Sequence, residues 1–293
     1  MFRLTKNGFI QITQISRYKY VENKLTLWYN NAEIEVNCML LTVDIGNTNI
    51  TTGMFEGDDL ILVTRIKTDR SKTPDQYSIE FKNIFNLYGI ECNITGCAIS
   101  SVVPELTRIV CQSIKTISDI EPLVLAPGIR TGMNILTDDP AQVGADLVAG
   151  GVGAANLYPL PCLIIDLGTA TKICLIDENG AFRGCTISPG IGISLEALSS
   201  RTSQLPAISL TTPSHSIGTN TIDSMESGIV FGTAAMLDGL CAKIEEEYGR
   251  PAATTVATGG LSKDIIKSCR RRIVHNGELI HHGLKIIYEK NTK

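Results

Sequence analysis

The sequence lacks the features that would mark a membrane-spanning, nucleic-acid-binding or secreted protein. No apolar run approaches the roughly 20 residues that a spanning helix needs, and the N-terminal segment lacks the continuous apolar core of a signal peptide. The formal net charge is −4, so we expect no polybasic surface for nucleic acid or an anionic membrane. These absences predict a soluble, cytoplasmic protein with neither nucleic acid nor a membrane as a partner.

Metal-binding and P-loop signatures are also missing. None of the nine cysteines forms Cys-x-x-Cys, and the four histidines do not flank them at zinc-ligand spacing. Several cysteines, including Cys162 and Cys174, lie in apolar runs, where a thiol behaves as a small hydrophobic side chain. Disulfide frameworks belong to oxidising compartments, so we expect reduced thiols. No Gly-x-x-x-x-Gly-Lys-Ser/Thr motif occurs, which excludes a P-loop kinase.

The chain has 293 residues, and 43% of them are hydrophobic. Since domains hold roughly 100–200 residues each, this length predicts about two domains. Residues 1–38 differ in composition and hold the only tryptophan, so we interpret them as an N-terminal extension of unassigned role. From Met39 onward strand-like and helix-like runs alternate, which favours α/β layers. The expected helices span residues 74–87, 104–118, 143–157, 194–198, 224–248 and 263–269.

An internal repeat predicts how these layers are organised. Residues 40–49 and 162–171 each form an apolar strand that ends in Asp-x-Gly, followed by small polar residues, a second strand and an acidic glycine turn. Two copies of one hairpin indicate two related α/β lobes. We expect the first lobe to span residues 39–157 and the second to span residues 158–293.

The Asp-x-Gly turns suit phosphate chemistry. Glycine at a hairpin tip lets a phosphate approach backbone N–H groups that a Cβ atom would shield. A carboxylate repels phosphate, so Asp44 and Asp166 make sense when a cation lies between them and the phosphate. The neighbouring small polar side chains are predicted to donate hydrogen bonds to phosphate: Asn47, Thr48, Thr169 and Thr171. A strand entering Gly259-Gly260 adds a bare backbone surface on which an adenosine could lie.

A third aspartate precedes a helix of small residues. Asp139 and Pro140 are typical of a short helical turn with its cap, and Gly144 allows close approach to Asp146. An aspartate in the first turn of a helix is ordinarily a cap. In a phosphate-transferring site Asp146 would also accept the proton of the attacking hydroxyl. Gly151 and Gly153 lie inside the expected helix, where they indicate close helix packing and not a dinucleotide fingerprint.

These motifs, in this order, resemble the type III pantothenate kinase family, and the likeness runs from Met39 to about Lys290. The matching segments are residues 44–49, 144–146, 166–171, 188–191, 199–206, 217–221 and 257–261. The resemblance implies an actin/Hsp70/sugar-kinase fold, with two ribonuclease H-like lobes and a nucleotide cleft between them. It also implies a cytoplasmic homodimer that phosphorylates pantothenate to 4'-phosphopantothenate, the first step of coenzyme A biosynthesis. ATP with Mg²⁺, and a monovalent cation, either K⁺ or NH₄⁺, are the implied cofactors.

The resemblance also implies roles for particular residues. The implied ATP-phosphate loop consists of Asp44, Ile45, Gly46, Asn47, Thr48, Asn49, Ile50 and Thr51. Asp146 would be the catalytic proton acceptor, Asp166 would hold the monovalent cation, and Thr169 would contact ATP. The implied substrate pocket is lined by Gly144, Ala145, Asp146, Leu147 and Thr221.

Two departures from the family pattern bear on the substrate. Leu147 stands where the family usually has arginine, and Thr137 stands near the place of a tyrosine, so the group that binds the pantothenate carboxylate can differ. One alternative is therefore a kinase for another small hydroxylated acceptor. A second is an ATP-binding accessory or regulatory protein without catalysis, which has no need of the base Asp146. The pair His281-His282 is expected on the solvated surface.

Overall fold

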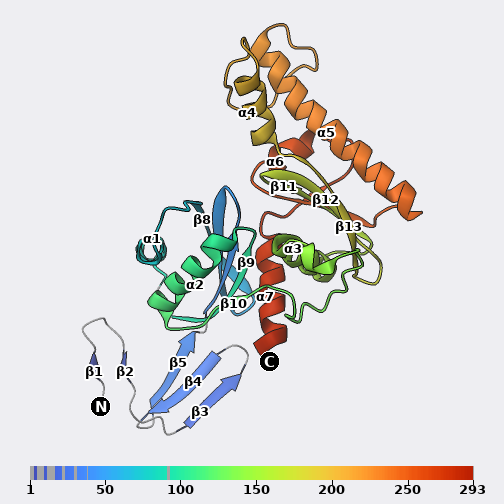
Figure 1. The fold of residues 1–293 in the computed structure, drawn as a ribbon. Helices are drawn as coiled ribbons and strands as arrows, with labels where there is room; N and C mark the ends of the chain where they lie inside the picture. Colours follow the sequence, from blue (N-terminus) through green and yellow to red (C-terminus); the bar gives the residue numbers. More distant parts are fainter. Residues whose placement is uncertain are drawn as a thin grey trace.

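In the computed structural model, two five-stranded sheets are separated by a layer of two helices, α3 (Ala145–Leu157) and α7 (Leu279–Thr292) (Figure 1). The structure describes residues 39–90 and 93–292, and the backbone of five strands before residue 39. Those strands are β1 (Arg3–Leu4), β2 (Ile10–Gln11), β3 (Arg17–Val21), β4 (Lys24–Tyr29) and β5 (Ala32–Asn37). The last three pair as an antiparallel sheet of their own.

The first large sheet has the strand order β10-β9-β6-β7-β8. Its strands are β6 (Met39–Ile45), β7 (Asn49–Glu56), β8 (Asp59–Lys67), β9 (Ile94–Ser101) and β10 (Leu123–Val124). The first three strands form an antiparallel meander, whereas β9 and β10 join in parallel. An apolar core fills the space between this sheet and the helices α1 (Pro74–Leu87) and α2 (Pro104–Ser118), whose bounds agree with the sequence prediction.

The second large sheet repeats that topology, with the order β13-β12-β11-β14-β15. Its strands are β11 (Cys162–Leu167), β12 (Ala170–Ile176), β13 (Phe182–Pro189), β14 (Thr254–Thr258) and β15 (Val274–His275). Again three antiparallel strands are followed by two parallel ones. The repeat in the sequence is therefore a duplication of structure.

The remaining helices cover the outer face of the second sheet. They are α4 (Ile191–Arg201), α5 (Thr221–Tyr248), α6 (Ser262–Ile265) and the 3₁₀ turn η2 (Ile266–Ser268), while the 3₁₀ turn η1 (Pro140–Gln142) precedes α3. The Asn220 side chain caps the start of α5, three residues before the expected start, and Gly249 ends the helix with a φ of 87°. By length and composition alone, α5 is the one helix among the described residues that could cross a membrane, which is weak evidence for a span.

Glycines allow α3 and α7 to approach closely between the sheets. A Cβ atom at Gly153 would lie 2.4 Å from the Leu279 carbonyl oxygen, and one at Gly283 would lie 1.8 Å from the Ala149 carbonyl oxygen. Gly153 thus serves helix packing, as expected. Side chains of both helices join one apolar cluster with residues of both sheets, among them Ala98 and Ile164. The pair of helices therefore fixes the two lobes against each other.

The predicted surface position of the pair His281-His282 is wrong for its first member. His281 is 3% exposed, and its Nδ1 lies 2.9 Å from the Thr42 hydroxyl. No helix is expected from the sequence at residues 279–292, yet α7 forms there and packs His281 against β6. Burial lowers the pKa of His281 to about 4, so the ring is neutral near pH 7. His282 is half-buried, with its ring edge against Phe55.

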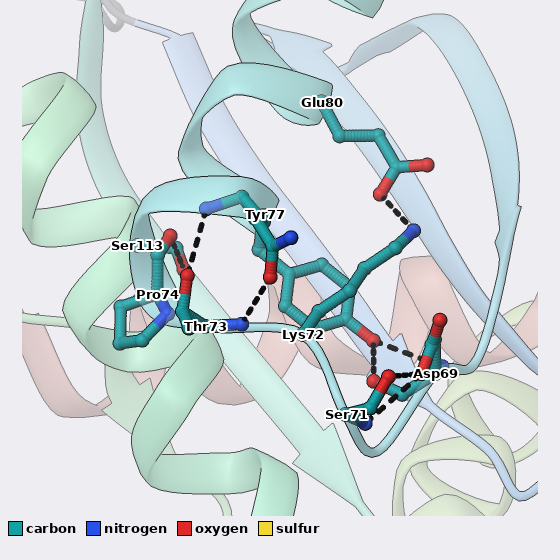
Figure 2. Close-up of polar contacts among 9 residues, drawn as sticks. Asp69, Ser71, Lys72, Thr73, Pro74, Tyr77, Glu80 and Ser113 are labelled. Atoms are coloured by element: carbon teal, nitrogen blue, oxygen red, sulfur yellow. Dashed lines mark hydrogen bonds and ion pairs between the residues drawn. The ribbon is translucent and has the colours of Figure 1, made fainter.

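The segment between β8 and α1 is held by the start of that helix (Figure 2). Thr73 and Gln76 form a capping box, which satisfies free backbone N–H groups at the start of α1. The hydroxyl of the fully buried Tyr77 donates to the Asp69 carbonyl and accepts from the Asp69 N–H. The Asp69 carboxylate in turn accepts from Ser71. These contacts give the chain after β8 a fixed path past the tip of the β6–β7 hairpin.

Candidate active site

The tips of the two duplicated hairpins meet. The Thr48 hydroxyl, after β6, lies 2.9 Å from the Thr169 hydroxyl, after β11, and both side chains are exposed. Asp44 and Asp166 stand near the ends of the same two strands and interact electrostatically with each other. Asp44 and Asp166 are 122 positions apart in the sequence. The two Asp-x-Gly turns nevertheless lie together in one place, as we expect of two facing hairpins.

Strand β9 supports Asp44. Asp44 pairs with Ser100 across the parallel strands, and the Ser100 hydroxyl donates to the Asp44 carboxylate at 2.8 Å. Burial, reinforced by the negative charge of Asp146, raises the pKa of Asp44 to about 7. The site thus holds more negative charge than its own residues neutralise.

A lysine joins the other two carboxylates. The Lys172 ammonium, on β12, lies 2.6 Å from Asp146 Oδ2 and 2.8 Å from Asp166 Oδ2. Burial alone would lower the pKa of Lys172, but the two carboxylates outweigh it, and the net shift is upward. For Asp166 burial has the opposite effect and raises the pKa, and the Lys172 charge reduces this shift. Lys172 is therefore a charged group at the centre of the site.

Asp146 lies in the first turn of α3, as predicted. Its Oδ1 accepts from the Leu147 N–H at 2.9 Å, so this carboxylate satisfies one backbone donor in the first turn of the helix that carries it. A Cβ atom at Gly144 would lie 2.5 Å from Asp146 Oδ1, which explains the glycine at this position. Ahead of it, the Asp139 carboxylate caps η1 by accepting from the Ala141 N–H, also as predicted.

The segment that follows β8 supports the turn between β6 and β7, which belongs to the predicted phosphate loop. The Thr68 hydroxyl donates to the Gly46 carbonyl at 2.7 Å, and the Thr68 N–H donates to the Thr48 carbonyl at 3.0 Å. Arg70 donates to the Asn47 side chain at 3.1 Å. Of the other predicted loop residues, Ile45 and Ile50 are fully buried in the core, while Asn49 and Thr51 are half-buried on β7. The side chains of Ile45 and Ile50 therefore cannot contact a nucleotide, and these two residues could do so only through their backbone atoms.

The predicted substrate residues do not all come together within one chain. Ala145 helps line a pocket of about 510 Å³ next to η1, and Leu147 packs on the apolar cluster between the sheets. The Thr137 hydroxyl is buried and has no hydrogen-bond partner among the described residues. Thr221, by contrast, is exposed at the start of α5, where it lines a separate pocket of about 700 Å³ beside α4. Figure 1 shows that region well apart from α3.

Sequence reasoning missed three residues of this site. Lys172 and Ser100 contact the aspartates directly. Arg65, on β8, reaches the second lobe, because a Cβ atom at Gly260 would lie 3.2 Å from its guanidinium. The strand register holds a signal for Lys172: Asp166 pairs with Lys172 on β12 as Asp44 pairs with Thr51 on β7. An alignment of the second strands of the two repeats places Lys172 opposite Asp166, where the first repeat has Thr51 opposite Asp44.

Residues 39–90 and 93–292 contain no group of three or more His, Cys, Asp or Glu side chains arranged to hold a metal ion. Seven cysteines in those residues are free thiols, in agreement with the expected reduced state. Cys38 and Cys92 lie outside the described residues. The polar contacts described above are made by carboxylates, hydroxyls and one ammonium.

Comparisons with known proteins agree with this geometry. A sequence model of the type III pantothenate kinase family matches residues 40–243. A type III pantothenate kinase of Exiguobacterium sp. is 41% identical over 257 residues, which is 87% of this chain and all of that protein. One of Shouchella clausii is 41% identical over 255 residues, which is 86% of this chain and all of that protein.

The fold is likewise shared with solved structures. The activator of 2-hydroxyisocaproyl-CoA dehydratase from Clostridium difficile, with bound ADPNP, has a TM-score of 0.54 at 13% identity, over 86% of this chain and 94% of that one. Component A of the Acidaminococcus fermentans (R)-2-hydroxyglutaryl-CoA dehydratase has a TM-score of 0.54 at 14% identity, over 87% of this chain and all of that one. The fold is that of the actin-like ATPases and sugar kinases, as expected.

Proposed function

The chain belongs to the type III pantothenate kinase family, and from that premise we propose that it phosphorylates pantothenate with ATP at Asp44, Asp146 and Asp166. The product would be 4'-phosphopantothenate, in the first step of coenzyme A biosynthesis. The observation that carries the proposal is the convergence of these three aspartates, from two lobes and a connecting helix, around the meeting point of two phosphate loops.

Asp146 is the proton acceptor in this proposal. Its position in the first turn of α3 is fixed by the Leu147 N–H and the Lys172 ammonium. A carboxylate held there can take the proton of the pantothenate hydroxyl as that oxygen attacks the γ-phosphoryl group. Holding the base and the acceptor in one orientation converts a bimolecular encounter into a local step.

The two hairpin tips bind the triphosphate. Thr48 and Thr169 are exposed and can each donate a hydroxyl hydrogen bond to phosphate oxygens. Their present contact with each other must break when a nucleotide enters between the lobes. The adenosine is assigned to the turn at Gly259-Gly260, next to Arg65.

The residues fit the magnesium that accompanies ATP. Three carboxylates face one ammonium, and Asp44, whose pKa is raised to about 7, carries the least compensated charge. Carboxylate oxygens are the ligands that Mg²⁺ prefers, and when bound the ion neutralises charge on the phosphates. Asp44 is the residue that would hold it.

The residues do not fit an added monovalent cation at Asp166. Asp166 Oδ2 already contacts the Lys172 ammonium at 2.8 Å. Two unit positive charges about 4 Å apart repel by roughly 4 kcal/mol at an effective dielectric constant of about 20. In this proposal no potassium or ammonium ion binds beside Asp166.

A homodimer would complete the substrate pocket. The start of α5, which carries Thr221, lies apart from α3, which carries Asp146 (Figure 1), so in this proposal Thr221 reaches the pantothenate from a second copy. The region around Thr221 is apolar and exposed: Ile217 is 83% exposed and Ile222 is 49% exposed. In the most apolar 18-residue stretch of α5, only 28% of the stretch is buried within the chain. A second copy packed on this face accounts for that surface.

The test is ADP release in a coupled assay with ATP, with and without pantothenate. The wild-type protein should release ADP only when pantothenate is present. Asp146→Asn should lower kcat by about 10²–10⁴-fold, the usual cost of losing a general base. Asp119→Asn is the matched control, because Asp119 is exposed at the end of α2 in a left-handed conformation that asparagine also adopts.

Each result bears on a separate part of the proposal. A wild-type protein that binds ATP without pantothenate-dependent ADP release would favour an accessory role. ADP release with another hydroxylated acceptor, but not with pantothenate, would show that the substrate is a different molecule. Leu147 and Thr137 would then be the residues to examine. Near-normal turnover in Asp146→Asn would remove that residue from the role of base.

A further inference from the structure

The Lys172 ammonium is held between two carboxylates in the middle of the candidate active site. It lies 2.6 Å from Asp146 Oδ2 and 2.8 Å from Asp166 Oδ2. The three side chains are only 16%, 13% and 15% exposed, in the order Lys172, Asp146 and Asp166. A buried ammonium costs solvation energy that only well-placed partners offset. The position of this charge is therefore a built feature of the site.

The fold itself does not require a lysine at this place. The two duplicated hairpins have the same register, with Asp44 opposite Thr51 in the first and Asp166 opposite Lys172 in the second. Thr51 shows that a small hydroxyl side chain satisfies the same position in the same type of hairpin. What distinguishes Lys172 from Thr51 is a unit positive charge that reaches the carboxylates, so the reason for the lysine lies in the chemistry of the site.

An ammonium group and a potassium ion offer the site the same thing: one positive charge surrounded by oxygen atoms. The ammonium of lysine has three N–H donors, and Asp146 and Asp166 engage two of them. The third can donate to a phosphate oxygen of a nucleotide between the hairpin tips. A lysine side chain also keeps this charge in place without recruiting an ion from solution.

We propose that Lys172 serves as the enzyme's own monovalent cation, with its ammonium in the position that a potassium or ammonium ion would take beside Asp166. The inference rests on the proposed kinase function of the same site. Its consequence is that phosphoryl transfer by this protein needs ATP and magnesium but no added monovalent cation. The lysine would neutralise charge that develops on the transferred phosphoryl group and would hold the base Asp146 in place.

The first experiment uses the wild-type protein, so it does not depend on the folding of any variant. Pantothenate-dependent ADP release is measured in Mg²⁺ with a bulky organic cation as the only other salt, and again with K⁺ or NH₄⁺ at the same ionic strength. We expect full turnover without K⁺ or NH₄⁺ and no stimulation by either ion. A requirement for one of them in the wild-type enzyme would overturn the proposal and leave the kinase assignment intact.

The second experiment replaces Lys172 with the residue found at the equivalent place in the first lobe. Lys172→Thr should lower kcat by about 10²–10³-fold when no monovalent cation is present, the cost of losing one transition-state charge partner. K⁺ or NH₄⁺ should restore most of this loss, because the threonine leaves the cation position open. Lys115→Thr is the matched control, since Lys115 also forms a 2.6 Å ion pair, with Glu121, but on the exposed surface.

A binding measurement provides a readout that does not depend on activity. K⁺ should raise the thermal unfolding midpoint of Lys172→Thr more than an organic cation does, since a ligand that binds only the folded state stabilises it. It should not raise that of the wild-type protein or of Lys115→Thr. A folded Lys172→Thr protein that binds ATP, yet neither gains stability nor recovers turnover with K⁺ or NH₄⁺, would contradict the proposal. Absence of ADP release from the wild-type protein in every salt would instead refute the kinase function.

Discussion

At the scale of single residues, the site combines three carboxylates with one buried ammonium. Each carboxylate has its own support: Ser100 for Asp44, the α3 backbone for Asp146, and Lys172 for both Asp146 and Asp166. The aspartates were predictable, because each belongs to a short local motif. Lys172 was not, because its role depends on atoms that the fold brings from α3 and β11.

The raised pKa of Asp44 predicts a pH-dependent stability. Its folded-state pKa is about 7 and its ordinary value is 3.8. As the pH rises from about 4 to about 7, the folded protein keeps a proton that the unfolded chain has lost, so folding stability falls over this range. Asp44→Asn removes that loss. We therefore expect the nucleotide-free Asp44→Asn protein to be more stable than wild type above pH 7, measured by urea unfolding across pH.

The control for this prediction is Asp119→Asn, an exposed aspartate whose replacement should leave the pH profile of the wild type unchanged. Parallel pH profiles for wild type and Asp44→Asn would contradict the interpretation. The same variant should bind ATP with magnesium poorly, because an amide has no negative charge to offer the ion. Greater stability with weaker nucleotide binding is the expected combination at a functional site.

At the scale of elements, two devices position the site. The hairpins β6–β7 and β11–β12 present their tips to each other, and the helices α3 and α7 hold the sheets at a fixed separation. The hairpins were predictable from the repeat. Helix α7 was not, because its burial becomes apparent only when both sheets are in place.

The close approach of α3 and α7 predicts the effect of a single methyl group. Gly283→Ala would place its Cβ atom 1.8 Å from the Ala149 carbonyl oxygen, a backbone atom that cannot move aside. We expect a loss of at least about 1–3 kcal/mol in the free energy of unfolding, the usual cost of overpacking. Urea unfolding at constant pH measures it.

Gly239→Ala is the matched control for this helix. Gly239 lies inside α5 with nothing within 4 Å of its added Cβ atom. Alanine there should raise the free energy of unfolding by about 0.5–1 kcal/mol, because it restricts the unfolded chain more than glycine does. Shifts of the same sign in both variants would count against the packing argument.

At the scale of the whole molecule, one chain contains two related lobes, and the residues predicted to bind the substrate line two separate pockets. Both sheets have the same strand order, and the last helix of the chain packs against strands of the first sheet. Residues 158–293 as a separate second lobe, and residues 1–38 as an extension, stay predictions. The start of α5, which carries Thr221, lies apart from α3, which carries Asp146 (Figure 1), so a second copy is part of the proposed site.

A complementation experiment tests the proposed dimer. Asp146→Asn and Thr221→Arg should each be nearly inactive alone, because each spoils every site in its own symmetric dimer. Co-expressed, the two chains should recover about a quarter of wild-type activity, since random pairing gives half mixed dimers with one intact site each. The measurement is kcat of the co-purified mixture. No recovery by chains that still form dimers would exclude a site that is shared between Asp146 of one chain and Thr221 of the other.

The sequence by itself determined the chemistry and the local structure. Asp-x-Gly motifs, glycine turns and helix caps act between residues close in the chain, so Asp44, Asp146, Asp166 and the bounds of α1 and α2 could be read directly. Only the tertiary structure decided what depends on distant residues meeting: the ion pairs of Lys172, the burial of His281 and the separation of Thr221 from Asp146. Electrostatic and packing energies depend on distance in space, and the order of residues along the chain does not specify that distance.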